Sequence, residues 1–251
     1  MIPRIIHQSW KTADVPTSML EFQDSWIRHH PGWEYRLWSD ADNDRLIHEH
    51  YPQFEEAFHR FSPPIVKIDF IRLAYVHCFG GLYTDVDFEA LRPLDSLLSD
   101  DRLTIGVENG GIGIPMRGRP FILNAFIASP VGHPLLLQIM QAMTDRFRQR
   151  RRFEPHAFHV IRMTIQIFDE LAETYARDHD DIIIHSHEPF YPAPPSMRFK
   201  DERRVLARRL NSYAIHHYAG TWVGLHVRLI NAVETVKQLW WRCWRRGKDS
   251  V

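Results

Sequence analysis

The sequence Phe79-Gly80-Gly81-Leu82-Tyr83-Thr84-Asp85-Val86-Asp87 joins a helix end, a short strand and two carboxylates. The glycines accept the left-handed backbone conformation that other residues resist, so they predict where a helix ends. The residues 82–84 then predict a short buried strand. Two carboxylates therefore follow a strand, at the place where an α/β sheet usually binds its ligands.

The pair Asp85 and Asp87 predicts a metal site. Side chains alternate along a strand, so both carboxylates should point to one face, with Cα atoms about 6.6 Å apart. Carboxylate oxygens suit Mg²⁺ or Mn²⁺, and these ions commonly hold substrate phosphates. An Asp-x-Asp pair alone is a weak signal, because acidic residues also cap or solvate strand ends.

Length and composition favour one large α/β domain. The chain has 251 residues, of which 44% are hydrophobic and 12% aromatic, enough to bury a full core. Lys plus Arg and Asp plus Glu both number 31, so no overall charge would attract nucleic acid. The first residues resemble no signal peptide, and no apolar stretch is long enough to span a bilayer. We therefore expect a cytoplasmic protein.

Hydrophobic periodicity predicts alternating strands and helices around a mixed central sheet. Strands are expected over 2–10, 33–38, 82–84, 103–108, 125–128 and 182–185, and helices over 18–30, 41–50, 52–61, 65–79, 134–150 and 161–175. The segment 189–197 contains four prolines, so we expect it to cross the surface.

The chain is expected to form one domain over 1–224, followed by a basic and aromatic tail over 225–251. The tail combines Trp240, Trp241 and Trp244 with six Lys or Arg residues, which is typical of an interfacial helix. It could lie on an anionic membrane surface, or it could pack on the domain or on another subunit.

Asp69 and Arg72 stand three residues apart on the predicted helix over 65–79, so they share a face. Asp69 could accept hydrogen bonds from ribose hydroxyls, and Arg72 could bind phosphate or sugar oxygens. The alternative is an ordinary surface ion pair. Such a pair contributes about 1 kcal/mol or less, so it gives little reason for this position.

Five blocks in order resemble the DXD sugar transferases of glycosyltransferase family 32, which includes yeast mannosyltransferases. The blocks are Ile2-Pro3-Arg4-Ile5-Ile6-His7-Gln8-Ser9-Trp10, Val66-Lys67-Ile68-Asp69-Phe70-Ile71-Arg72, Gly80 to Asp87, Asn124 to Pro134, and Ala214-Ile215-His216-His217-Tyr218 with Thr221-Trp222. The resemblance implies a GT-A fold, a divalent cation (Mn²⁺ or Mg²⁺) and a nucleotide-sugar donor. It also implies hexose transfer, with retention at the anomeric carbon, to a glycan, lipid or other hydroxyl acceptor.

The resemblance also implies roles for the acidic residues. Asp87 would bind the metal directly, and Asp85 would serve both the metal and the donor sugar or ribose. Arg72 would neutralise the diphosphate charge. His216 or His217 would complete the metal shell, and one sequence does not choose between these two histidines.

Three further residues are candidate donor contacts. Trp10 could stack on the base of the nucleotide, or it could be a core tryptophan. Asn124 could bind sugar hydroxyls, or its amide could satisfy a loop. Trp222 could donate its indole N–H to a diphosphate oxygen.

The chain departs from the family pattern at one place on the acceptor side. Many relatives carry a Thr-Gly-Pro turn where this chain has Met163-Thr164-Ile165-Gln166.

Three rival functions remain open. A haloacid-dehalogenase-like phosphohydrolase also ends a strand in Asp-x-Asp, but it usually carries Thr or Val where this chain has Phe88. A glycosidase needs carboxylates on opposite sides of the sugar bond, which neighbouring strand positions do not supply. A catalytically inactive sugar-nucleotide-binding module would keep the fold without the activity. Eukaryotic relatives usually carry an amino-terminal membrane anchor, whereas this sequence begins with its first expected strand. We therefore expect a bacterial or viral cytoplasmic enzyme.

Overall fold

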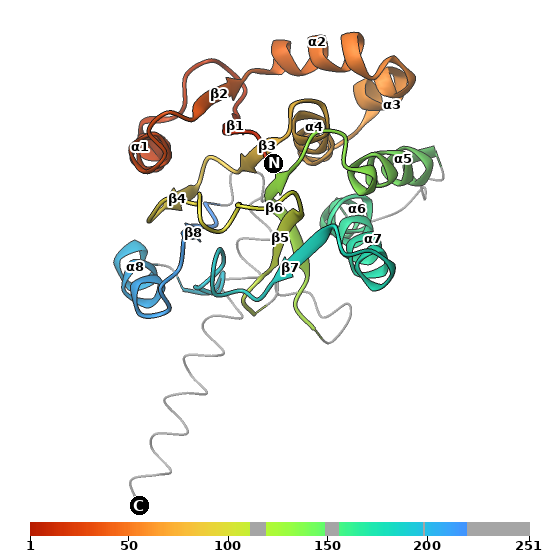
Figure 1. Ribbon diagram of the computed structural model, residues 1–251. Coiled ribbons are helices and arrows are strands. Elements are labelled where there is room, and N and C mark those ends of the chain that lie inside the picture. Colours follow the sequence, from red (N-terminus) through yellow and green to blue (C-terminus); the bar gives the residue numbers. More distant parts are fainter. Residues whose placement is uncertain (111–118, 149–155, 198, 220–251) are drawn as a thin grey trace, which may run out of the picture.

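The computed structural model describes the chain except for residues 111–118, 149–155, 198 and 220–251. The described part is built on a mixed sheet with the strand order β2-β1-β3-β6-β5-β7 (Figure 1). β2, β1 and β3 are parallel, β6 is antiparallel to β3 and β5, and β7 is parallel to β5. The strands are β1 (Ile5–Ser9), β2 (Glu34–Trp38), β3 (Gly81–Thr84), β5 (Leu103–Val107), β6 (Ile122–Ser129) and β7 (Ile182–His185).

A second, two-stranded sheet pairs β4 (Phe88–Ala90) with β8 (Ala214–His216) in antiparallel register. Phe88 is paired with His216 in this register. β4 follows the acidic turn directly, so the small sheet brings a residue from late in the sequence next to that turn.

Helices cover the central sheet and flank the small one. α4 (Pro64–Phe79) packs against β1, β3 and β6 and against α5 (Pro134–Arg148), which in turn contacts α7 (Ile165–Asp178). α1 (Leu20–His29) lies against β4, and α8 (Lys200–Arg209) lies against β8 (Figure 1). The remaining helical elements are η1 (Thr17–Met19), α2 (Asp40–His50), η2 (Pro52–Phe54), α3 (Glu55–Arg60) and α6 (His156–Met163).

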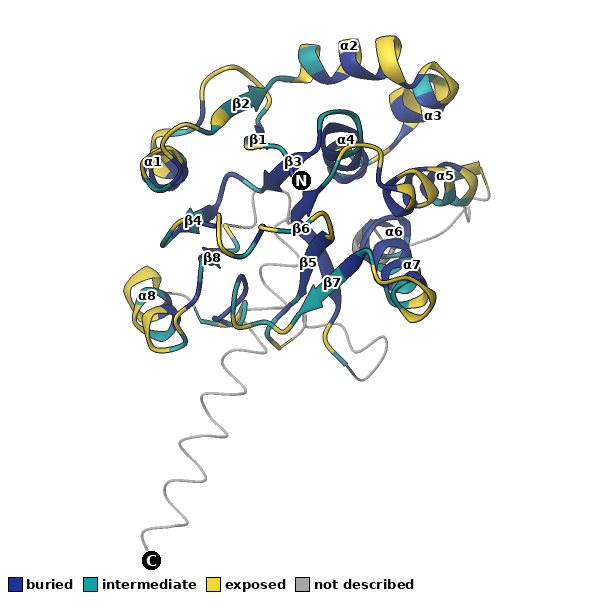
Figure 2. Cartoon of the chain, viewed as in Figure 1, coloured by how far each residue is buried: buried dark blue, intermediate teal, exposed yellow. Residues whose placement is uncertain are grey.

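Two hydrophobic cores lie on the two faces of the central sheet. Within β3, Tyr83 joins the core formed with α4, α5 and α7, whereas its neighbour Leu82 joins the core that contains Trp26 and Phe88. This separation follows from the alternation of side chains along a strand. Figure 2 shows the central strands buried, while the outer faces of α2, α5 and α7 are exposed.

The predicted GT-A type architecture, a mixed central sheet flanked by helices, is confirmed, and each predicted strand is present. The helix predicted over 161–175 is wrong in its continuity. Thr164 leaves helical geometry with φ −126° and ψ −76°, so α6 ends at Met163 and α7 begins at Ile165. α4 ends as predicted, at Gly80 with φ 64°. α8 was not expected from the sequence.

The prediction that 189–197 crosses the surface is wrong over 190–193. Phe190 and Tyr191 are fully buried, and the Phe190 ring stacks on Phe126 at 3.8 Å between centroids. Gly106 of β5 allows this approach, since a Cβ there would lie 2.9 Å from the Phe190 ring. The prolines therefore frame a segment whose aromatic residues enter the core.

No described helix is both long and apolar enough to cross a membrane. The tail predicted over 225–251, the domain boundary predicted at 224 and the basic aromatic C-terminal helix all lie outside the described residues.

Candidate functional site

The acidic pair lies in a tight turn between β3 and β4. The Phe88 N–H donates to the Asp85 carbonyl at 3.0 Å, which closes the turn. The Asp85 N–H donates to the Ala125 carbonyl at 3.1 Å and so fixes the turn to β6. We expected strand alternation to align the two carboxylates. It is the turn that brings Asp85 and Asp87 together.

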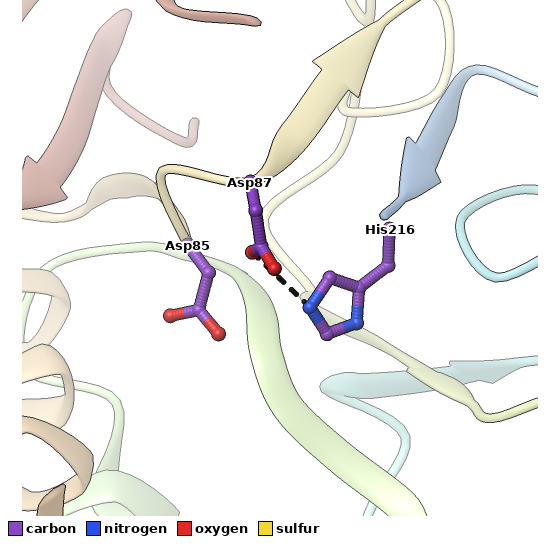
Figure 3. A group of neighbouring side chains, drawn as sticks. All are labelled: Asp85, Asp87 and His216. Carbon is purple, nitrogen blue, oxygen red and sulfur yellow. Dashed lines mark ion pairs between the residues drawn. The ribbon is translucent and has the colours of Figure 1, made fainter. Parts of the chain in front are cut away.

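Asp85, Asp87 and His216 form a cluster in which one ligand atom of each lies within 4.8 Å of the others (Figure 3). The His216 Nε2 lies 3.2 Å from the Asp87 Oδ1. The His216 ring also stacks on Phe88, with 4.6 Å between centroids, and this contact sets the ring plane. Figure 3 shows both carboxylates and the imidazole directed into one space.

The charge on Asp87 is stabilised by its neighbours. Burial raises its pKa, but the His216 ring and the Ala219 N–H, which donates to the Asp87 Oδ2 at 2.7 Å, lower that pKa to about 2. Asp87 is therefore ionised at neutral pH and can serve as an anionic metal ligand. Two carboxylates and an imidazole fit a divalent cation such as Mn²⁺, and the buried His216 Nδ1 has no hydrogen-bond partner among the described residues.

Arg72 connects α4 to the acidic turn. Its Nη2 lies 3.0 Å from the Asp69 Oδ1 and 3.1 Å from the Asp85 Oδ1. Its Nη1 donates to the Asn124 carbonyl and side-chain oxygen, both at 3.2 Å. Burial lowers the pKa of Arg72, but the carboxylates around it raise that pKa by more. The net pKa lies above its ordinary value, so the group stays charged.

The residues around Arg72 have further hydrogen bonds of their own. The Asn124 Nδ2 donates to the Asp69 Oδ1 at 3.1 Å, and the Tyr83 hydroxyl donates to the Asp85 Oδ1 at 2.8 Å. Burial raises the pKa of both Asp69 and Asp85, and the charge of Arg72 opposes that rise. The ordinary surface ion pair considered for Asp69 and Arg72 is excluded, because both side chains are less than a tenth exposed.

The two adjacent histidines face different partners. His216 lies at the acidic pair, whereas the His217 Nε2 lies 2.8 Å from a carboxylate oxygen of Glu89. The His217 ring stacks on Phe22 at 4.4 Å, and Arg204 donates twice to the same glutamate. Among the described residues, His216 is thus the histidine placed to share a cation with the two aspartates.

The two predicted tryptophan contacts differ in position. Trp10 is half-buried and packs against the small cluster that includes Phe22 and Val86, the residue between the two aspartates. It borders the acidic turn, and stacking on a base stays a prediction. Trp222 lies outside the described residues.

Sequence reasoning missed several polar residues at the site. Gln8 donates to the Asp85 carbonyl at 3.1 Å, and Tyr83 holds the Asp85 side chain. Glu108 follows β5, is fully buried, and burial raises its pKa to about 7. One signal could have identified Glu108, because it is an acidic residue at the end of an apolar strand, as Asp85 is.

The chain is similar to known glycosyltransferases in sequence and in fold. Residues 16–104 match the family described as glycosyltransferase sugar-binding region containing DXD motif. Mannosyl phosphorylinositol ceramide synthase SUR1 of Saccharomyces cerevisiae is 36% identical over 130 residues, which cover 50% of this chain and 34% of that protein. Inositol phosphoceramide mannosyltransferase 3 of Schizosaccharomyces pombe is 33% identical over 140 residues, covering 56% of this chain and 36% of that protein.

Among solved structures, PaToxG Glycosyltransferase shares the fold with a TM-score of 0.53 and 12% identity, covering 71% of this chain and 72% of that one. The chain spans about a third of the length of the two curated relatives. The chain is therefore similar to the DXD-motif glycosyltransferases, and residues 16–104 match the sugar-binding region of that family.

Proposed function

We propose that this chain is a metal-dependent retaining glycosyltransferase that moves a hexose from a nucleotide-diphosphate sugar to a hydroxyl acceptor. The observation that carries the proposal is the convergence of Asp85, Asp87 and His216 on one space. The acceptor oxygen would replace the diphosphate at the anomeric carbon, and the acceptor proton would leave with the diphosphate. A bound divalent cation supplies Lewis-acid stabilisation of the departing diphosphate.

The residues of the chain divide this work. Asp87 and His216 would hold the cation, and Asp85 would be shared between the cation and the donor. Asp69, Arg72 and Asn124 are engaged with one another and with Asp85. We propose that these three residues position Asp85, in addition to the donor contacts expected from the sequence.

The proposal extends to the identity of the donor sugar, the acceptor and the metal ion. The two relatives are named as an inositol phosphoceramide mannosyltransferase and a mannosyl phosphorylinositol ceramide synthase. We therefore propose mannose as the first sugar to test and a lipid-linked or glycan hydroxyl as the first acceptor class. Mn²⁺ is proposed ahead of Mg²⁺ because an imidazole accompanies the two carboxylates.

The decisive experiment is donor hydrolysis over a panel of UDP- and GDP-linked hexoses, with Mn²⁺, with Mg²⁺ and with a chelator. At least one donor should be cleaved only with metal. Asp87→Asn should lose about 100-fold or more of that activity, since metal stabilisation of a leaving group contributes several kcal/mol. Asp24→Asn, an exposed change on α1, should keep the wild-type rate. Cleavage of simple phosphate esters without cleavage of any nucleotide sugar would favour the phosphohydrolase instead, and binding of a nucleotide sugar without any cleavage would favour the inactive binding module.

Contact of the tail over 225–251 with an anionic membrane is a separate part of the proposal. The full chain and a chain without these residues can be compared by flotation with anionic liposomes. We expect only the full chain to float. Equal flotation of both would remove the membrane from the list of partners.

A further inference from the structure

Glu108 is a buried acidic residue that the described chain leaves unsatisfied. It is 0% exposed, and neither of its carboxylate oxygens has a hydrogen-bond partner among the described residues. A buried carboxyl without partners costs free energy, and such a group in a native protein calls for an explanation, such as a functional role or a bound ion or water. Folding alone therefore gives no reason for an acidic residue at this position.

The surroundings of Glu108 connect it to the candidate metal cluster. Its electrostatic neighbours are His216 and Tyr218, and the Tyr218 hydroxyl, like the carboxyl itself, has no hydrogen-bond partner among the described residues. The ring of Tyr218 lies over that of His216, with 4.0 Å between centroids. The carboxyl is thus next to the metal cluster but is not one of the three grouped ligands.

Tyr218 is held in this position at a cost. Its φ of 52° is in the left-handed region, which bulky residues rarely adopt. The Arg203 guanidinium lies over its ring at 5.0 Å and donates to the His216 carbonyl at 2.8 Å. Backbone strain of this kind persists where the surrounding structure enforces it, and it is common at ligand sites.

Tyr191 supplies a second buried hydroxyl in the neighbourhood of the acidic groups. It is 0% exposed, its ring lies 6.0 Å from that of His216, and its electrostatic neighbours include both Asp85 and Glu108. Its hydroxyl also has no hydrogen-bond partner among the described residues. Glu108, Tyr191 and Tyr218 thus form a group of unpaired polar atoms bordered by aromatic rings.

The chemistry of this group favours a neutral, hydroxylated ligand. A carboxyl accepts hydrogen bonds from hydroxyls, and a phenol can both donate and accept. A phosphate would place negative charge beside Glu108 and is disfavoured. We propose that Glu108, Tyr191 and Tyr218 bind hydroxyl groups of the transferred hexose beside the metal cluster, an inference that rests on the proposed function.

The test compares two ligands by calorimetry in the presence of Mn²⁺ and without acceptor. One ligand is the nucleotide sugar that the wild type cleaves, and the other is the same nucleoside diphosphate without sugar. Glu108→Gln should bind the nucleotide sugar about tenfold or more weakly, since hydrogen bonds to an acidic group are among the stronger ones. Its affinity for the nucleoside diphosphate should stay within about twofold of wild type.

Further variants sharpen the assignment. Tyr218→Phe, which keeps the ring, should show the same selective loss and serves if Glu108→Gln fails to fold. Glu49→Gln, an exposed change on α2, should affect neither ligand. A series of donors that each lack one hydroxyl should include one donor that binds the wild type weakly. Glu108→Gln should bind that donor with the same affinity as the wild type does, because the contact is already missing.

The outcomes separate this inference from the proposed function. A wild type that binds and cleaves a nucleotide sugar while Glu108→Gln and Tyr218→Phe bind it unchanged would overturn the inference alone. Equal losses of affinity for both ligands would also overturn it. So would variants that bind the nucleotide sugar unchanged and show a rise only in the KM of the acceptor. A wild type that binds no nucleotide sugar would remove both.

Discussion

At the scale of single residues, Arg72 is the group on which the site depends. Its guanidinium is 3% exposed and contacts Asp69, Asp85 and Asn124. Removing one partner of a buried ionic network leaves charge without compensation, and this costs far more than the loss of a surface pair. The position of Asp85 should therefore depend on a residue that need not contact the donor.

Arg72→Met tests this dependence. Because Asp69 and Asp85 would lose their cation, we expect a loss of about 3 kcal/mol or more in the free energy of unfolding, measured with urea. Arg60→Met is the matched control, since the ion pair of Arg60 with Glu56 is exposed and should contribute about 0.5 kcal/mol. Similar losses in the two variants would contradict the network as a stabilising unit.

His7 shows how burial fixes a protonation state. The Trp38 Nε1–H donates to the His7 Nδ1 at 3.1 Å, and the His7 Nε2 lies 2.9 Å from the Gly80 carbonyl. These partners require a neutral ring that carries its proton on Nε2. Burial lowers the pKa of His7 from 6.5 to about 4.

This lowered pKa predicts a dependence of stability on pH. Between pH 6.5 and 4 the unfolded chain binds a proton at His7 that the folded chain does not, so the stabilisation is complete above 6.5 and falls as the pH falls to 4. The size is about 3 kcal/mol. Urea unfolding across this range should give a shallower fall for His7→Gln than for wild type, while the exposed change His48→Gln keeps the wild-type slope. Identical slopes for His7→Gln and wild type would contradict the argument.

At the scale of elements, the pairing of β1 with β3 depends on glycine. Gly81 has a φ of 93°, and a Cβ there would lie 2.5 Å from the Ile5 carbonyl oxygen. The close approach of these two backbones places the start of β3 beside β1, and the acidic turn follows at the other end of this short strand. The glycine is required both by its backbone conformation and by the space it leaves.

Gly81→Ala should therefore destabilise the protein by about 3 kcal/mol, because it combines an unfavourable φ with a backbone clash. Gly132→Ala separates the two causes. Gly132 has a φ of 73° but open space around it, so its replacement should cost only about 1 kcal/mol. Chemical denaturation measures both, and an equal cost would show that backbone conformation alone matters.

At the scale of the whole molecule, the candidate metal site joins distant parts of the chain. Asp85 and Asp87 follow the central sheet, whereas His216 belongs to β8 of the small sheet (Figure 1). A cation that binds all three would bind the folded chain and not the unfolded one. Binding of this kind stabilises the fold as a whole.

Mn²⁺ with nucleoside diphosphate should accordingly raise the Tm. At a ligand concentration 100 times Kd the gain is about 2.7 kcal/mol, which for a chain of this size is several degrees. Thermal unfolding should show this shift for wild type and for Asp24→Asn, and a chelator should abolish it. A full shift in Asp87→Asn would place the cation elsewhere.

Local sequence determined most of the elements and the identity of the acidic pair. Hydrophobic periodicity and the glycines at 80 and 81 predict α4 and β3, because helix ends and short buried strands depend on neighbouring residues. The same local signals failed where a long-range contact overrides them. The proline-rich segment is buried at Phe190 and Tyr191 because Gly106, far away in sequence, leaves room for their rings.

The geometry of the site was decided by tertiary structure. The sequence alone identified Asp69, Arg72, Asp85 and Asp87 as candidates, since acidic and basic residues near a strand end can be recognised without the structure. The choice of His216 over His217 required the pairing of β4 with β8, and the unsatisfied state of Glu108 required its burial. Contacts between residues far apart in sequence depend on how sheets and helices pack, and no local pattern contains that information.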